Sequence, residues 1–135
     1  MTQSPSIQPA ILGVGIDLCE VDRIRDLTDR YGDRFLHRAY TDVEIDYIGG
    51  GPGAYRRSAA VFAGKEAVVK CLGTGFARGV GWKQVEVMQR DAAWCVELSG
   101  EARAVAVSAG PSTWMMAVNT DGDRALAIAI WSKQW

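Results

Sequence analysis

The chain has 135 residues, of which 48% are hydrophobic and 23% charged, and its net charge is −1. These values are typical of a globular protein and exclude a largely disordered chain. The apolar runs are too short to cross a bilayer, and the nearly neutral charge offers no general attraction to nucleic acid. Three widely spaced cysteines indicate neither a disulfide framework nor a zinc site, which favours a reducing cytoplasm.

The length fits a single domain, which we expect at residues 11–135. The preceding stretch, MTQSPSIQPA at residues 1–10, is typical of a loose N-terminal tail. It has no basic region followed by an apolar stretch, so it does not indicate a secretory signal.

The first predicted element is a strand, ILGVGID at residues 11–17. Its branched residues suit a pleated sheet, and its two glycines permit another backbone to approach closely. Asp17 is expected at the carboxyl end of this strand. A helical spacing of apolar residues then runs from Val21 to about Tyr40, and Gly32 is placed to break it.

A short helix and the longest helix follow. Thr41 and Glu44 form a capping-box pattern that should open the short helix before the breaker GGGPG at residues 49–53. The alanine-rich stretch 56–72 is the strongest helix signal. The remaining elements are a hairpin, a short amphipathic helix and a second hairpin, at residues 85–90 with 94–100, 100–110, and 113–119 with 124–131. This order predicts an α+β fold, with a mostly antiparallel sheet packed against the long helix.

Glu66 and Lys70 lie four residues apart on the longest predicted helix. An exposed ion pair explains the spacing, but most neighbours are small or apolar, and a carboxylate at a partly buried edge is costly unless something binds it. Asp17 is open to two interpretations as well, because an acid at a strand end also serves as a turn or helix cap. If the two acids meet in space, they offer the hard oxygen ligands that Mg²⁺ shares with substrate phosphates.

Arg23, Arg30 and Arg34 are separated by seven and four residues, so a continuous helix would place them on one stripe. One interpretation is a solvated helix face on which arginine alternates with aspartate. The other is a basic patch that selects an acidic partner although the whole chain is nearly neutral.

Two motifs, GxDLxExxRI at residues 15–24 and FAxKEAxxKxxGTG at residues 62–75, occur in this order. With them the chain resembles the holo-acyl-carrier-protein synthases, the small trimeric class of 4′-phosphopantetheinyl transferases, from about Ile11 to Ile130. The resemblance implies Mg²⁺-dependent transfer of 4′-phosphopantetheine from coenzyme A to a serine of an apo acyl or peptidyl carrier protein. Adenosine 3′,5′-bisphosphate would leave, and the carrier protein would serve fatty acid or polyketide biosynthesis.

The resemblance also implies roles for single residues. Asp17 and Glu66 would hold Mg²⁺ against the pyrophosphate of coenzyme A, and Lys70 would neutralise phosphate charge or assist proton transfer. The three arginines would grip the acidic helix of the carrier protein, and a homotrimer would place the coenzyme at the boundaries between subunits. Further contacts with coenzyme A are expected from Lys65, Gly73, Thr74, Gly75, Asn119 and Thr120.

Two departures from the family pattern fall on the coenzyme side. Val61 stands where the family has an arginine, and Asn119-Thr120 replaces a late Ser/Thr-His turn. Arg56 or Arg57 could restore the charge from the preceding turns. The first hypothesis is therefore a transferase with altered coenzyme contacts. The alternative is a divergent homologue that binds a carrier protein or its pantetheine arm without transferring the group, or that acts on a carrier-tethered substrate.

Overall fold

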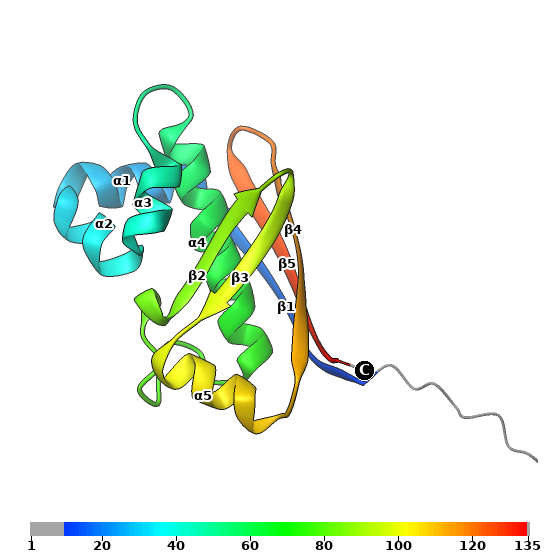
Figure 1. The fold of residues 1–135 in the computed structure, drawn as a ribbon. Helices are drawn as coiled ribbons and strands as arrows, with labels where there is room; N and C mark the ends of the chain where they lie inside the picture. The colour runs from blue at the N-terminus through cyan, green and yellow to red at the C-terminus, as the bar shows by residue number, and fades with distance from the viewer. Residues whose placement is uncertain (1–9, 135) are drawn as a thin grey trace, which may run out of the picture.

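The computed structural model describes residues 10–134 and shows one long helix packed against strands of two antiparallel sheets (Figure 1). The predicted α+β fold is confirmed, and the predicted tail lies outside the described residues except for Ala10. The elements in chain order are β1 (Ile11–Glu20), α1 (Val21–Tyr31), α2 (Asp33–Ala39), α3 (Asp42–Ile48), α4 (Ala54–Leu72), η1 (Trp82–Gln84), β2 (Val85–Arg90), β3 (Ala93–Leu98), α5 (Gly100–Ser108), β4 (Ser112–Thr120) and β5 (Arg124–Lys133).

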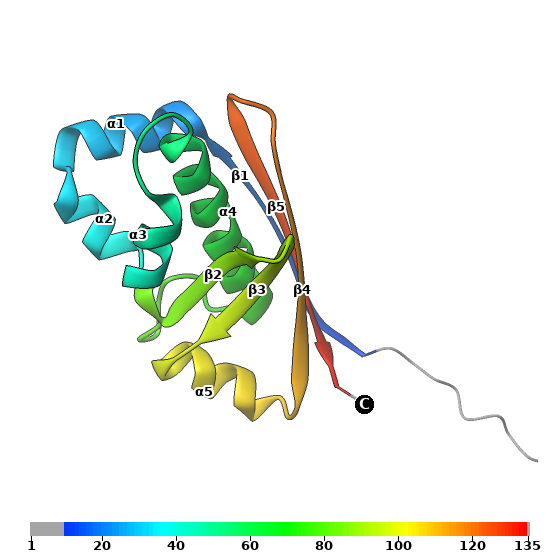
Figure 2. The ribbon, with the colours of Figure 1, turned by 45° about the horizontal axis from the view of Figure 1, so that its top comes forward.

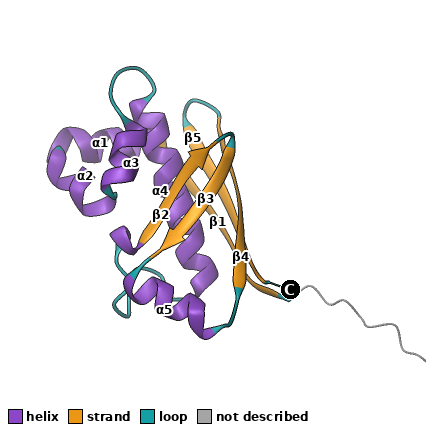
Figure 3. Cartoon of the chain, in the orientation of Figure 1, coloured by secondary structure: helices purple, strands orange, loops and turns teal. Residues whose placement is uncertain are grey.

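The strands divide into a three-stranded sheet in the order β1-β5-β4 and a separate β2-β3 hairpin. Helix α4 packs on β1 and β5 and also contacts β2 (Figure 2). Helices α1 to α3 gather beside one end of α4, and α5 lies near its other end (Figure 3). No helix within residues 10–134 is long and apolar enough to span a membrane.

Strand β1 is longer than predicted, which changes the position of Asp17. The strand continues to Glu20, because Leu18 remains on the exposed face, Cys19 remains buried, and both residues pair with β5. Asp17 therefore lies inside the strand, opposite Ala127, and not at its carboxyl end as the sequence predicted.

Two glycines of β1 allow the strand to lie directly on α4. A Cβ atom at Gly15 would be 1.9 Å from the carbonyl oxygen of Ala67, and one at Gly13 would be 2.4 Å from that of Cys71. Contacts this short exclude any side chain, so the predicted close approach of another backbone is confirmed. This approach brings the segment that carries Asp17 against the helix that carries Glu66.

Candidate active site

The acidic pair Asp17 and Glu66 lies where β1 packs on α4. Burial first, and then the negative charge of Asp17, raises the pKa of Glu66 above its ordinary value, while Lys70 and Arg23 oppose the shift. Such repulsion acts between charges that are close together. Lys70, one turn after Glu66 on α4, also contacts Asp17, so the structure brings together two acids that are 49 positions apart in the sequence.

Lys70 lies one helical turn after Glu66 and contacts Asp17. Its Nζ atom is 3.0 Å from Asp17 Oδ1 and donates a hydrogen bond of 2.8 Å to the carbonyl oxygen of Ile16. The Asp17 side chain is 17% exposed and that of Lys70 is 50% exposed, so this ion pair lies at the edge of the surface. Lys70 therefore pairs with Asp17 on β1, and not with Glu66 on its own helix as the spacing allowed.

The two carboxylates match the ligand preferences of Mg²⁺. Within residues 10–134, no group of three or more His, Cys, Asp or Glu side chains is placed to hold a metal ion. Mg²⁺ needs no such cage, because it binds through one or two carboxylates and keeps water and substrate phosphate oxygens as its other ligands. Burial is the main cause of the raised pKa of Glu66, and the charge of Asp17 adds to it; a shared cation would relieve this second contribution.

Lys65 lies in the core, away from the predicted phosphate contacts. Its side chain and that of Glu44 are both 0% exposed, and the Lys65 ammonium donates hydrogen bonds to the Glu44 carboxylate and to the carbonyl oxygen of Val85. Its neighbours one turn away on α4 are also buried, so the helical period turns Lys65 inward. The prediction that Lys65 binds coenzyme A is therefore wrong for this arrangement.

The glycine turn at residues 73–75 follows α4 directly. Gly73 caps the helix with φ 77°, and its N–H donates to the carbonyl oxygens of Val69 and Lys70. Gly75 has φ 59°, and a Cβ at either glycine would meet no atom within 4 Å. The turn therefore exposes bare backbone to open space one turn after Lys70.

The predicted arginine stripe is divided by Gly32, whose φ of 56° ends α1 before α2 begins. Arg34 thus belongs to a different helix from Arg23 and Arg30. Two hollows adjoin at Leu27: the first combines two arginines with three acids, and the second combines two arginines with Leu27 and two aromatic side chains. The first is lined by Glu20, Asp22, Arg23, Asp26, Leu27 and Arg30, and the second by Leu27, Tyr31, Arg34, Phe35 and Arg38. We call these two hollows together the arginine face.

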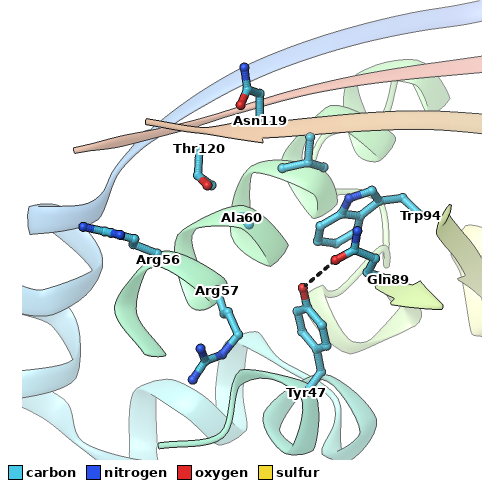
Figure 4. A pocket seen from close by; sticks show the side chains of 9 residues that line it. Tyr47, Arg56, Arg57, Ala60, Gln89, Trp94, Asn119 and Thr120 are labelled. Atoms are coloured by element: carbon cyan, nitrogen blue, oxygen red, sulfur yellow. Dashed lines mark hydrogen bonds between the residues drawn. The ribbon is translucent and has the colours of Figure 1, made fainter. Parts of the chain in front are cut away.

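A pocket of about 260 Å³ lies between the first turns of α4, strand β4, helix α3 and the β2-β3 hairpin (Figure 4). Arg56 and Thr120 border it, and Figure 4 shows the Thr120 side chain pointing into it. Asn119 also borders the pocket, but its side chain points to the opposite side of β4, as alternation along a strand requires. The remaining lining residues are Tyr47, Arg57, Ala60, Gln89, Trp94 and Val118.

Arg56 and Arg57 bring positive charge to the pocket beside Asn119 and Thr120, the two residues that were predicted to contact coenzyme A. Arg57 donates to the carbonyl oxygens of Ile48 and Gly50, at 2.7 and 3.1 Å, and so also secures the loop before α4. Val61 is fully buried and cannot contact a ligand there. Sequence patterns could not reveal the aromatic wall of Tyr47 and Trp94, because those side chains meet only through tertiary packing.

Comparison with known proteins identifies the family of this chain. The family model of the 4′-phosphopantetheinyl transferase superfamily matches residues 13–129. The holo-[acyl-carrier-protein] synthase of Desulforudis audaxviator is 42% identical over 121 residues, which cover 89% of this chain and 92% of that protein. The chain therefore belongs to the 4′-phosphopantetheinyl transferase superfamily.

Within that superfamily the chain is an enzyme of the holo-acyl-carrier-protein synthase type, as its two motifs predicted. The crystal structure of the holo-[acyl-carrier-protein] synthase from Neisseria meningitidis matches its fold with a TM-score of 0.81 at 22% identity, covering 92% of this chain and 99% of that chain. The synthase of Bacillus anthracis, solved in complex with CoA (3′,5′-ADP), matches with a TM-score of 0.74 at 25% identity, covering 92% and 98%.

Proposed function

We propose that the protein transfers 4′-phosphopantetheine from coenzyme A to a serine of an apo acyl or peptidyl carrier protein, with Mg²⁺ as cofactor. The serine oxygen forms a bond to the β-phosphorus of coenzyme A and gives up its proton to water, and adenosine 3′,5′-bisphosphate leaves with the electrons of the broken P–O bond. We place the reaction in the cytoplasm, in fatty acid or polyketide biosynthesis, where the free cysteines Cys19, Cys71 and Cys95 stay reduced.

The convergence of Asp17, Glu66 and Lys70 beside the open glycine turn supports this proposal most strongly. Asp17 and Glu66 would hold Mg²⁺, which neutralises diphosphate charge when bound. The half-exposed Lys70 ammonium would neutralise a phosphate oxygen at the same edge. Gly73, Thr74 and Gly75 would let the diphosphate approach bare backbone.

Mass spectrometry of an apo carrier protein incubated with the enzyme, coenzyme A and Mg²⁺ tests the proposal. We expect the carrier protein to gain one phosphopantetheine, and the gain to require the divalent cation. The absence of any gain with several acyl and peptidyl carrier proteins would contradict it.

The nucleotide end of coenzyme A would occupy the pocket of Figure 4. Arg56 offers positive charge for a phosphate, Thr120 offers a hydroxyl, and the rings of Tyr47 and Trp94 offer a wall for a base. Asn119, on the other side of β4, would reach the coenzyme only from a neighbouring subunit or through its backbone.

The carrier protein would bind the arginine face. Arg34→Glu should raise the KM for the carrier protein about tenfold or more at low ionic strength, because the reversed charge repels an acidic helix and surface electrostatics are weakened by salt over a Debye length of about 8–10 Å. Transfer rates at two salt concentrations measure the effect. Arg103→Glu on α5 is the matched control, because Arg103 is also exposed and the charge change is identical. Equal effects of the two variants would remove Arg34 from the interface.

Three chains would associate through the outer face of the three-stranded sheet. Strand pairing aligns its apolar side chains in rows across β1, β5 and β4, and large ones remain exposed in the single chain, such as Ile16 at 54% and Met115 at 65%. A contiguous apolar face of this kind marks an interaction site. The side chains of the outer face are Val14, Ile16, Leu18, Met115, Ala117, Leu126, Ile128 and Ile130.

Ile128→Asp, in the central strand of this face, should convert the trimer to a monomer in light scattering. We also expect it to lower the transfer rate, because the coenzyme site would be shared between subunits. Val107→Asp on α5 is the matched control, since Val107 is 65% exposed and lies on another surface. A wild-type protein that is monomeric at assay concentration would contradict the trimer.

The alternative from the sequence, a divergent homologue without transferase activity, rests on the buried and uncharged Val61, although Arg56 and Arg57 bring positive charge to the neighbouring pocket. Calorimetry distinguishes the two: the alternative predicts binding of the carrier protein without affinity for coenzyme A. Turnover of a holo carrier protein without release of adenosine bisphosphate would instead indicate a carrier-tethered substrate.

A further inference from the structure

Three aromatic rings stack between α4 and the loop at residues 73–81. The ring centroids of Phe62 and Trp82 are 4.7 Å apart at an interplanar angle of 29°, and those of Trp82 and Phe76 are 3.7 Å apart at 20°. Phe62 belongs to α4, Trp82 to η1, and Phe76 to the loop. We call these three residues the aromatic column. It joins three segments of the chain in one packed unit.

The column begins on the face of α4 that carries Glu66. Phe62 precedes Glu66 by one helical turn, so the two side chains lie on the same side of the helix. Phe62 is 4% exposed, and the guanidinium carbon of Arg23 lies 5.3 Å from its ring centroid. This cation–π contact joins the Phe62 end of the column to α1.

The other end of the column is adjacent to the glycine turn. Phe76 follows Gly75 directly, and Thr74 uses its hydroxyl for a local hydrogen bond to the carbonyl oxygen of Gly75. The far part of the loop has its own attachments, because Val80 is buried and Gln84 donates to the carbonyl oxygen of Gly79 at 3.0 Å. Glycines do not hold a backbone conformation by themselves, so the turn needs an anchor on the Phe76 side.

We propose that Trp82 is a positioning residue for coenzyme A. Stacked between Phe62 and Phe76, it fixes the glycine turn against the helix that carries Glu66 and Lys70, so that the backbone of the turn is preorganised for the diphosphate. This inference rests on the proposed transferase function. Trp82 itself would contact neither the coenzyme nor the reacting atoms.

Trp82→Ala and Trp82→Phe, compared in the full-length protein, test the role. Because a displacement of about 1 Å in a positioned group can cost about 100-fold, we expect Trp82→Ala to raise the KM for coenzyme A at least about tenfold. The KM for the carrier protein should stay within about twofold, because Phe62 and its contact with Arg23 remain in place and the other arginines of the arginine face lie outside the column. Trp82→Phe keeps a stacking ring and should recover most of the loss. Calorimetric affinity for coenzyme A provides a readout that does not depend on turnover.

If Trp82→Ala does not fold, Phe76→Ala tests the same role, because it removes the loop side of the column and leaves the Phe62–Trp82 pair intact. Trp114→Ala is the matched control: it breaks another stacked tryptophan pair, with Trp131 at 5.5 Å, and should leave the coenzyme KM unchanged. Unchanged coenzyme affinity in Trp82→Ala and Phe76→Ala, with a fully active wild type, would overturn the positioning role alone. A wild type that neither binds coenzyme A nor transfers its group would overturn the proposed function and this inference with it.

Discussion

Glu66→Gln should lower the rate of phosphopantetheine transfer about 1000-fold or more, because a metal site contributes several kcal/mol to the transition state and each 1.4 kcal/mol is about tenfold in rate. The amide keeps the size of the side chain but loses the charge that binds a hard cation. The loss should appear in kcat, measured from the mass of the carrier protein over time. Carrier-protein binding should persist, because Arg30, Arg34 and Arg38 of the arginine face are not among the charges that act on Glu66.

Glu97→Gln is the matched control for this prediction, since Glu97 is an exposed acid on β3 and its variant should retain wild-type rates.

The pH dependence of Mg²⁺ binding is a second check. Burial and Asp17 raise the pKa of Glu66, so its proton is lost at a higher pH than usual, and Mg²⁺ affinity should fall as the pH is lowered through that raised pKa. Full activity of Glu66→Gln would exclude Glu66 from the mechanism.

Lys65→Met should lower the free energy of unfolding by about 3–5 kcal/mol at neutral pH, because it leaves the Glu44 carboxylate buried without its ammonium partner. Glu44 is held firmly: its oxygens accept hydrogen bonds from the N–H groups of Thr41 at 2.8 Å and Val87 at 2.9 Å, as well as from Lys65. The carboxylate therefore cannot move out to water without breaking the start of α3 and its contact with β2. Denaturant unfolding with the linear extrapolation measures the change.

The deficit in Lys65→Met should shrink at lower pH. Burial already raises the pKa of Glu44 in the folded protein, and loss of the lysine raises it further. A carboxyl group whose pKa is higher in the folded than in the unfolded state stabilises the fold at low pH, and this contribution is lost as the pH rises through the folded pKa. Adding Glu44→Gln to Lys65→Met should recover part of the stability at neutral pH, because no buried charge remains.

Arg25→Met is the control for the buried pair. It removes the cation of an exposed ion pair, in which the side chain of Arg25 is 49% exposed and that of Asp22 is 81% exposed. The free energy of unfolding should therefore fall by less than about 1 kcal/mol. Equal costs for Arg25→Met and Lys65→Met would contradict the structural importance of the buried pair.

The capping box shows what sequence patterns can and cannot predict. Thr41 and Glu44 predict the start of α3 from local spacing, and both reciprocal hydrogen bonds are present. The same carboxylate also accepts from Val87, more than 40 residues away, and no local pattern contains that contact. A lysine on the buried side of α4 was the available signal that a buried acid must exist, because an ammonium in the core needs a partner.

The sequence predicted the two acids of the candidate site but little of what surrounds them. The glycines of β1 signalled the close approach that brings Asp17 to α4, and the two motifs supplied the pairing of Asp17 with Glu66. The three arginines do not form a single stripe, because Gly32 ends α1 before α2 begins. The angle between these two helices depends on tertiary packing. The pocket beside Thr120 joins four elements, so only the folded chain reveals it.

Anomalous diffraction from crystals soaked with Mn²⁺ and coenzyme A would locate the divalent cation. We expect one anomalous peak between the carboxylates of Asp17 and Glu66, coordinated also by oxygens of the coenzyme diphosphate, and no peak at this position in crystals of Glu66→Gln. Coenzyme A bound with its diphosphate distant from both acids, or a metal peak elsewhere in every subunit, would contradict this expectation.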